Sequence, residues 1–217
     1  MQKQGVVRED GPVRRRPRYQ IEPTDLADRI WDAKVITPLQ LHRIVAWKSA
    51  RGLAWVTLNT EEEIMLRSSQ ALTAIEDLRG LDVRQPGTDW RRWEDAVRQA
   101  VGASDPPRGL QGLSGIGFPV ASAVLAILSP RTFPVIDRWA MTAVYGRPSN
   151  NFQTAGFYRH YTEQLVGIGH HYPDCATVHE LDQAVMNAAM RCDHDIRPCE
   201  CMPFPVAQSP ATSAASD

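Results

Sequence analysis

The most informative segment of this chain reads Leu113-Ser-Gly-Ile-Gly-Phe-Pro-Val-Ala-Ser-Ala-Val-Leu-Ala-Ile-Leu128 and is followed shortly by Phe133-Pro-Val-Ile-Asp137. Gly115 and Gly117 flank one apolar residue, Ile116, a pattern that suits neither a helix interior nor a strand interior. We expect a tight hairpin in which Ile116 enters the core. Both glycines are expected to adopt backbone angles that other residues avoid.

A buried helix is predicted directly after this hairpin. Its apolar residues recur at helical spacing, as Val120, Ala121, Val124, Leu125 and Leu128. The two glycines would leave the first amides of the helix uncovered and pointing outward. Uncovered amides at a helix N-terminus form an anion site, and a loop of this kind suits a nucleic-acid phosphate.

The hairpin and the segment beyond it resemble a known family. Leu-x-Gly-Ile-Gly followed by an Ala-rich helix resembles the helix-hairpin-helix, and residues 105–147 together resemble the helix-hairpin-helix Gly/Pro-Asp (HhH-GPD) superfamily of DNA glycosylases. Asp137 lies 22 positions after Gly115, as in the endonuclease-III-like members, and Phe133-Pro-Val-Ile-Asp137 is most similar to the adenine-glycosylase branch. The resemblance covers about a fifth of the chain.

The resemblance implies a two-lobed helical fold, double-stranded DNA as the partner and hydrolysis of the bond between a base and its sugar. Asp137 would act at the sugar, where a carboxylate stabilises positive charge or activates water. Pro119 stands where bifunctional members carry a lysine, which implies a monofunctional glycosylase without lyase activity. The hairpin would also hold a monovalent cation through backbone carbonyls. The implied DNA-binding residues of the hairpin and its helix are Leu113, Gly115, Ile116, Gly117, Val120 and Ala121.

Three cations are candidates for contacts to the DNA backbone. Arg138 follows Asp137 where family members often have a small or polar residue, and it could pair with phosphate. Lys48 and Arg51 end the segment Trp47-Lys-Ser-Ala-Arg51. They either contact DNA opposite the hairpin or only favour the C-terminal dipole of a helix whose Trp47 lies in the core. Asp137 likewise has a simpler interpretation as a helix N-cap, and the two roles are compatible.

The C-terminal cysteines resemble an incomplete metal site. Cys192 and Cys199 have the first spacing of the Cys-x6-Cys-x2-Cys-x5-Cys iron–sulfur pattern of the family, but Cys201 comes one residue early and no fourth cysteine follows. Four thiolates are the usual requirement of such a cluster, so we expect it to be lost. Cys192, His194, Cys199 and Cys201 would offer zinc three sulfurs and one nitrogen. Free thiols are the default, and we predict no metal.

Length and composition fit one soluble domain. The chain has 217 residues, of which 43% are hydrophobic, and it contains neither a run of eighteen apolar residues nor a signal-peptide core. We expect a cytoplasmic monomer that does not bind membranes. Residues 1–20 are interpreted as a disordered basic arm, 21–201 as one helical glycosylase-like domain and 202–217 as a disordered tail.

The net charge of −1 does not argue for strong binding to nucleic acid. The charge is uneven, however, because residues 1–18 hold six basic and two acidic side chains. This arm therefore carries +4 and the rest of the chain −5. A body of that charge can still bind DNA through a local basic face.

Periodicity and capping signals predict an all-α fold. Four residues are expected to open or cap helices, namely Thr24, Thr37, Thr60 and Asp89. Further helices are expected after Asp137, over 151–169 and over 177–191. Three functions stay open: a glycosylase, a non-catalytic helix-hairpin-helix module that binds DNA or protein, and a hairpin that serves only as a corner between helices.

Overall fold

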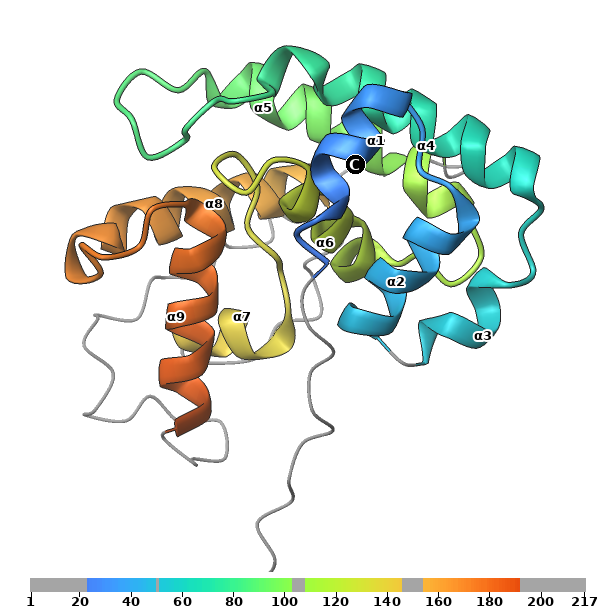
Figure 1. Cartoon of the computed structure of the whole chain (residues 1–217). Helices are drawn as coiled ribbons and strands as arrows, with labels where there is room; N and C mark the ends of the chain where they lie inside the picture. The colour runs from blue at the N-terminus through green and yellow to red at the C-terminus, as the bar shows by residue number, and fades with distance from the viewer. Residues whose placement is uncertain (1–22, 50, 103–107, 146–153, 192–217) are drawn as a thin grey trace, which may run out of the picture.

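The computed structural model describes residues 23–49, 51–102, 108–145 and 154–191. Every regular element within these ranges is helical, which confirms the predicted all-α class. The α-helices are α1 Leu26–Ala33, α2 Pro38–Lys48, α3 Gly52–Val56, α4 Glu61–Ile75, α5 Trp90–Val97, α6 Phe118–Leu128, α7 Arg138–Tyr145, α8 Ala155–Ile168 and α9 Val178–Arg191 (Figure 1). Shorter turns are the 3₁₀ helices Glu76–Leu78, Gly109–Gly112 and Gly169–His171 and the π-helical turn Arg98–Gly102. The arm and tail predicted to be disordered lie outside the described residues.

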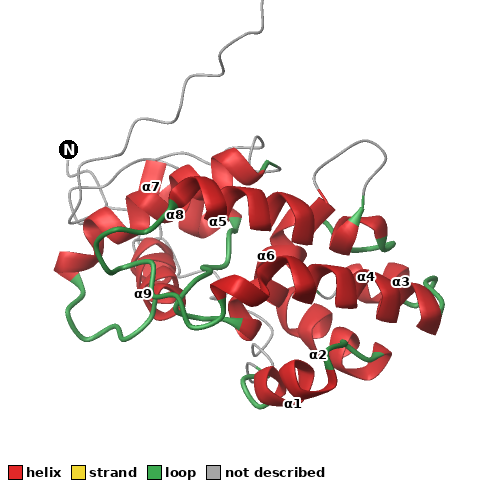
Figure 2. Ribbon diagram, turned by 90° about the horizontal axis from the view of Figure 1, so that it is seen from above, coloured by secondary structure: helices red, strands yellow, loops and turns green. Residues whose placement is uncertain are grey.

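Helix α6 lies at the centre of the molecule in both ribbon views (Figures 1 and 2). All of its residues except Pro119 are buried, as expected for a helix that is apolar on every side. Helices α1 and α2 pack against it, and the Trp31 indole NH of α1 donates to the carbonyl of Leu128 at 2.9 Å. The segment predicted to be a buried helix is therefore the core around which the other helices are arranged.

Three of the four predicted helix starts are confirmed by their capping bonds. The Thr37 hydroxyl accepts from the Gln40 NH and the Thr60 hydroxyl from the Glu63 NH, each with the reciprocal bond of a capping box. The Asp89 carboxylate accepts from the Arg92 NH at 3.0 Å. These local signals are reliable because a cap satisfies amides that the helix itself leaves without acceptors.

Two short elements differ from the prediction. Helix α1 begins at Leu26 with Asp25 at its N-cap position, so Thr24 does not cap it. The Asp25 carboxylate instead pairs with the Arg43 guanidinium of α2 at 2.8 Å. Helix α3 was not predicted, because five residues are too few to establish a helical period.

The chain between α6 and α7 is fixed by aromatic residues of α5 and α8. The Trp93 indole NH donates to the Thr132 carbonyl at 3.1 Å, and the Tyr158 hydroxyl donates to the Pro134 carbonyl at 2.5 Å. The rings of Trp93 and Tyr158 also lie against each other, with centroids 5.1 Å apart. The buried apolar residues, from Leu26 to Val185, form one cluster. No helix within the described ranges is long and apolar enough to cross a membrane.

Candidate nucleic-acid interface

The predicted hairpin is present, and its two glycines differ. The Ile116 side chain is buried as predicted, and its NH donates to the Leu113 carbonyl at 3.2 Å. Gly115 has φ +81°, in the left-handed region that favours glycine. Gly117 has φ −82° and ψ 172°, which any residue adopts. The prediction of unusual backbone angles is therefore correct for Gly115 and wrong for Gly117.

Gly115 also packs directly on α3. A Cβ atom at Gly115 would lie 2.8 Å from the Gly52 carbonyl oxygen and 2.8 Å from the Trp55 Cβ. Asn59 stabilises the contact between α3 and the hairpin. Its side chain accepts a hydrogen bond from the Ser114 NH at 2.7 Å and donates one to the Ser114 carbonyl at 3.1 Å. The sequence did not predict this role of Asn59. The only indication was its position directly before Thr60, the cap of α4.

The uncovered amides of α6 are fewer than predicted. The Val120 NH donates to the Gly117 carbonyl at 3.0 Å, so the prediction that the first amides are uncovered is wrong for Val120. Within the described chain, the NH groups of Gly117 and Phe118 have no acceptor. The possible anion site is thus limited to the backbone where the hairpin enters the helix.

Four of the residues predicted to bind DNA have buried side chains. Leu113, Ile116, Val120 and Ala121 are each less than one-tenth exposed. Their side chains pack into the core, so any contact of Leu113, Ile116 and Ala121 with DNA would be made by the backbone, while Val120 also lines the cavity described below. Their role is to hold the hairpin backbone in place.

A cavity of about 430 Å³ lies beside the hairpin, and we call it the hairpin hollow. It joins the end of α2, helix α3 and the start of α6. Lys48 and Arg51 line it together with the hairpin glycines. Of the two roles that the sequence left open for these cations, this position fits a contact opposite the hairpin. The exposed indole of Trp55 also lines it. The complete lining is Lys48, Ser49, Arg51, Gly52, Trp55, Gly115, Gly117, Pro119 and Val120.

Asp137 is the N-cap of α7, as its simpler interpretation predicted. One carboxylate oxygen, Oδ1, accepts from the NH groups of Trp139 and Ala140 at 2.8 and 2.9 Å. The other oxygen, Oδ2, lies 3.2 Å from the Lys48 Nζ. The two side chains are mostly buried, with exposed fractions of 12% for Lys48 and 21% for Asp137. Lys48 therefore connects the hairpin hollow to the Asp137 carboxylate.

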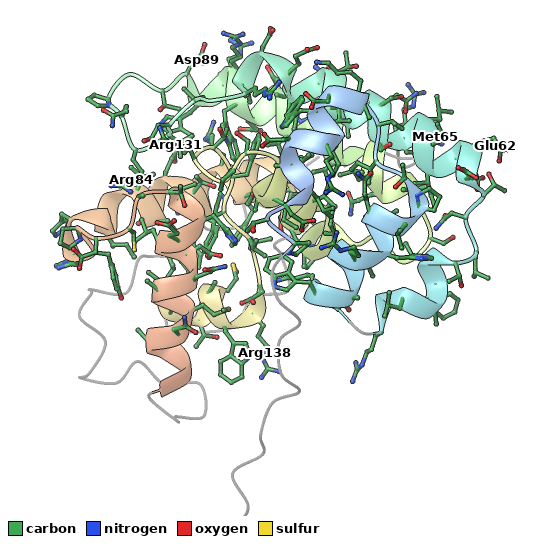
Figure 3. All side chains as sticks on the ribbon, viewed as in Figure 1. Glu62, Met65, Arg84, Asp89, Arg131 and Arg138 are labelled. Atoms are coloured by element: carbon green, nitrogen blue, oxygen red, sulfur yellow. The ribbon has the colours of Figure 1, made fainter. Side chains whose placement is uncertain are left out.

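The two predicted arginines, Arg51 and Arg138, differ from Lys48 because they have no acidic partner among the described residues. Arg51 and Arg138 are exposed, and neither forms an ion pair with a residue that the structure describes. The Arg138 side chain, at the start of α7, points away from the rest of the molecule (Figure 3). Arg138 does not line the hollow. Trp47 of α2 is half-buried, and its ring meets the His179 ring edge-on at 6.1 Å.

A second carboxylate lies buried behind Asp137. Asp182 of α9 accepts from the Val135 NH at 3.2 Å, and the Tyr161 hydroxyl donates to its other oxygen. Burial, and then the charge of Asp137, raises the pKa of Asp182 to about 7, although the bond from Tyr161 opposes this shift. Sequence reasoning missed this residue. It could have been noticed because an aspartate at this position falls on the apolar face of the helix, beside Val178, Leu181 and Val185.

A larger cavity of about 1320 Å³ lies between α4 and α5 and shares no residue with the hairpin hollow. Five arginines and three aspartates line it, and two of these arginines have acidic partners in the lining: Arg92 pairs with Asp77 at 3.0 Å, and Arg98 pairs with Asp95 at 3.2 Å. Neither the hairpin glycines nor Lys48 lines this cavity, so it is not the site that the hairpin predicts.

No cluster of three or more His, Cys, Asp or Glu side chains within the described residues could hold a metal ion. The residues considered for iron–sulfur or zinc binding, Cys192, His194, Cys199 and Cys201, lie outside the described ranges. Comparison of the chain with protein-family models, curated proteins and solved structures finds no match.

Proposed function

We propose that this protein binds double-stranded DNA through the hairpin and hydrolyses the bond between a damaged, mismatched or modified base and its deoxyribose. The observation that carries the proposal is the position of Lys48. It lines the hairpin hollow together with Gly115 and Gly117, and its ammonium contacts Asp137. The hairpin backbone, to which the proposal assigns the phosphate, and the carboxylate are therefore linked by one lysine.

The proposed chemistry needs a carboxylate beside the sugar. A base inside a duplex is out of reach, so the nucleotide must leave the stack, and its sugar gains positive charge as the base departs. Asp137 would stabilise that charge or activate water. Its position is fixed by the two backbone NH groups that bind Oδ1, which keeps Oδ2 directed toward Lys48. A fixed carboxylate needs little reorganisation during the reaction.

Groups around the hollow suit a DNA backbone and an unstacked base. The NH groups of Gly117 and Phe118 would bind a phosphate, and Arg51 would add positive charge. Trp55 is 61% exposed at the rim, where an indole could stack on a base or sugar. The two-lobed arrangement and a monovalent cation at the hairpin belong to the same proposal and are supported by the family resemblance alone.

A non-catalytic DNA-binding module is the second candidate. It is favoured by the hydrogen bonding of Asp137, since both carboxylate oxygens already have donors within the protein. A carboxylate with these partners can serve as a helix cap and an ion-pair partner without any chemistry.

The first experiment compares the wild-type chain with Asp137→Asn on duplex oligonucleotides that each contain one damaged or mismatched base. Asparagine keeps an oxygen for the Trp139 and Ala140 NH groups, so the cap should survive. We expect wild type to release a base from at least one duplex and the substitution to lower that rate by about 100-fold or more. Asp77→Asn, at an exposed pair with Arg92, is the matched control and should retain the rate.

Base release is measured by mass spectrometry and folding by thermal melting. Duplex binding without base release across the panel would favour the module. If the chain binds no duplex at low salt, both candidates fail and the hairpin is a corner between helices.

A further inference from the structure

We propose that the larger cavity, between α4 and α5, is a docking groove for an acidic segment of another protein. We call it the arginine groove. The arginines that line it are Arg67, Arg91, Arg92, Arg98 and Arg108. The inference goes beyond the proposed function and does not depend on it, because the groove shares no residue with the hairpin hollow. Figure 3 shows the separation, with Asp89 of the groove near the top and Arg138, next to Asp137, at the bottom.

The groove follows two helical segments that run antiparallel. Asp77, just after α4, pairs with Arg92 in the first turn of α5 at 3.0 Å, and the π-helical turn that follows α5 packs against α4 again. Helix α5 must therefore run back along α4. On the α4 side the lining extends from Arg67 to Asp77, which is about 15 Å of helix at 1.5 Å per residue. A groove of this length suits a segment of chain.

The lining carries an excess of positive charge. It contains five arginines and three aspartates, and each aspartate already has a partner. Asp77 pairs with Arg92, Asp95 pairs with Arg98, and the Asp89 carboxylate caps α5. The positive excess therefore lies with the other three arginines.

These three arginines come from different elements. Arg67 belongs to α4, Arg91 belongs to α5, and Arg108 directly precedes the 3₁₀ helix Gly109–Gly112. None of their guanidinium groups forms an ion pair or a hydrogen bond with a residue in the described ranges, although Arg67 is half-buried. A planar guanidinium can bind a carboxylate through two parallel hydrogen bonds. Three such groups facing one groove would bind several carboxylates of one segment.

The backbone at one end of the groove is unusual. Within the described chain there is one π-helical turn, Arg98–Gly102, and three of its residues line the groove. Such turns are rare and are frequently found at functional sites. Gly102 has φ +77°, and a Cβ atom there would overlap the Arg108 carbonyl. The contact that places Arg108 beside the π-helical turn therefore requires glycine.

The composition of the lining favours a protein segment over other anions. Small-molecule sites are mostly apolar, whereas most of the described residues of this lining are charged or polar. Single-stranded nucleic acid stacks its bases on aromatic side chains, and none lies among the described lining residues. The three aspartates would also repel a continuous row of phosphates. A protein segment can instead place acidic residues opposite arginines and neutral or basic residues opposite the aspartates.

The test uses the full chain and a fluorescently labelled helical peptide that has glutamate at every third or fourth position. The same peptide with glutamine in place of glutamate shows whether the negative charge is needed. Fluorescence anisotropy at low salt measures both affinities, and we expect the glutamine peptide to bind at least about tenfold more weakly. Arg67→Gln combined with Arg108→Gln should lower the affinity for the glutamate peptide by about tenfold.

The matched control is Arg29→Gln combined with Arg131→Gln. Both arginines are exposed, neither lines the groove, and the change in net charge is the same, so the affinity should not change. Thermal melting checks that both double variants fold. Equal losses of affinity in the two double variants would show attraction by net charge alone and would overturn the inference.

Two further outcomes would also overturn it. The first is a wild-type chain that does not bind the glutamate peptide at low salt. The second is a labelled single-stranded oligonucleotide that binds more tightly than the peptide and loses affinity with Arg67→Gln and Arg108→Gln, since the groove would then be a nucleic-acid site. Base release from the earlier panel of duplexes reports on the proposed function separately, because neither substituted arginine lies at the hairpin hollow.

Discussion

The two glycines of the hairpin differ in backbone angle and in the space around them. Gly115 needs a positive φ and lies against the backbone of α3, whereas Gly117 has an ordinary φ and its nearest neighbour is the Pro119 Cδ. Both glycines look alike in the sequence. The constraint on Gly115 comes from α3, and α3 was not visible in the sequence.

Gly115→Ala is therefore expected to destabilise the protein far more than Gly117→Ala. A Cβ at Gly115 would lie 2.8 Å from the Gly52 carbonyl oxygen, and the left-handed conformation adds strain, so we expect a loss of about 2 kcal/mol or more. At Gly117 the nearest atom would be 3.8 Å away, and the change should stay within about 1 kcal/mol. Urea unfolding of both variants measures the difference. Equal losses would contradict the described packing.

At the scale of elements, α9 is joined to the start of α7 by a buried carboxyl group. Asp182 binds the backbone two residues before Asp137, and Tyr161 of α8 donates to the same carboxyl. Three elements thus meet at one side chain directly behind the candidate site. Moving α9 would shift Val135 and, through the chain, the Asp137 cap.

This contact makes the stability of the fold depend on pH. The pKa of Asp182 is raised from 3.8 to about 7 in the folded protein, so between these values the folded chain binds more protons than the unfolded chain. The contribution of Asp182 is therefore complete below about pH 4 and is lost as the pH rises to about 7. We expect a slope of up to about 1.4 kcal/mol per pH unit.

Asp182→Asn should remove this slope while keeping an oxygen for the Val135 NH. Chemical unfolding of wild type and variant at several pH values between 4 and 8 measures it. The difference between the two curves isolates Asp182 from the ionisable groups that face it, His179, Lys48 and Asp137, because both proteins contain them. Parallel curves would show that Asp182 is ionised in the folded state throughout this range.

At the scale of the whole molecule, the net charge of −1 opposes nonspecific attraction to DNA. Affinity must then come from local cations. Many of the described basic side chains are neutralised within the protein, as Arg43 is by Asp25 and Arg98 is by Glu94. Arg51 lines the hairpin hollow and Arg138 follows Asp137, and neither forms an ion pair within the described chain, which makes these two the candidates for phosphate contacts at this site.

Duplex binding is accordingly expected to weaken with salt. Arg51→Gln and Arg138→Gln should each lower the slope of log affinity against log salt concentration by about 1. Arg43→Gln removes a cation that is already paired with Asp25 and should leave the slope unchanged. Fluorescence anisotropy with a labelled duplex over a range of salt concentrations gives the slopes. Identical slopes in all four proteins would place the interface elsewhere.

Local patterns were sufficient for much of the architecture. The caps at Thr37, Thr60 and Asp89, the buried helix after the hairpin and the burial of Ile116 all follow from interactions within a few residues. Such interactions repeat at helical spacing or satisfy amides at helix ends, so they leave a trace in the sequence. Asp137 as the start of α7 belongs to the same class.

The contacts that define the candidate site cannot be predicted from local sequence patterns. Lys48 and Asp137 are 89 positions apart, and Asn59 and Ser114 are 55 positions apart. A lysine at the end of one helix and an aspartate at the start of another are each explained locally by the helix dipole, so neither predicts the other. Only the packing of α2 and α3 beside the hairpin and α7 brings them together, because a pair distant in sequence depends on how every helix between them folds.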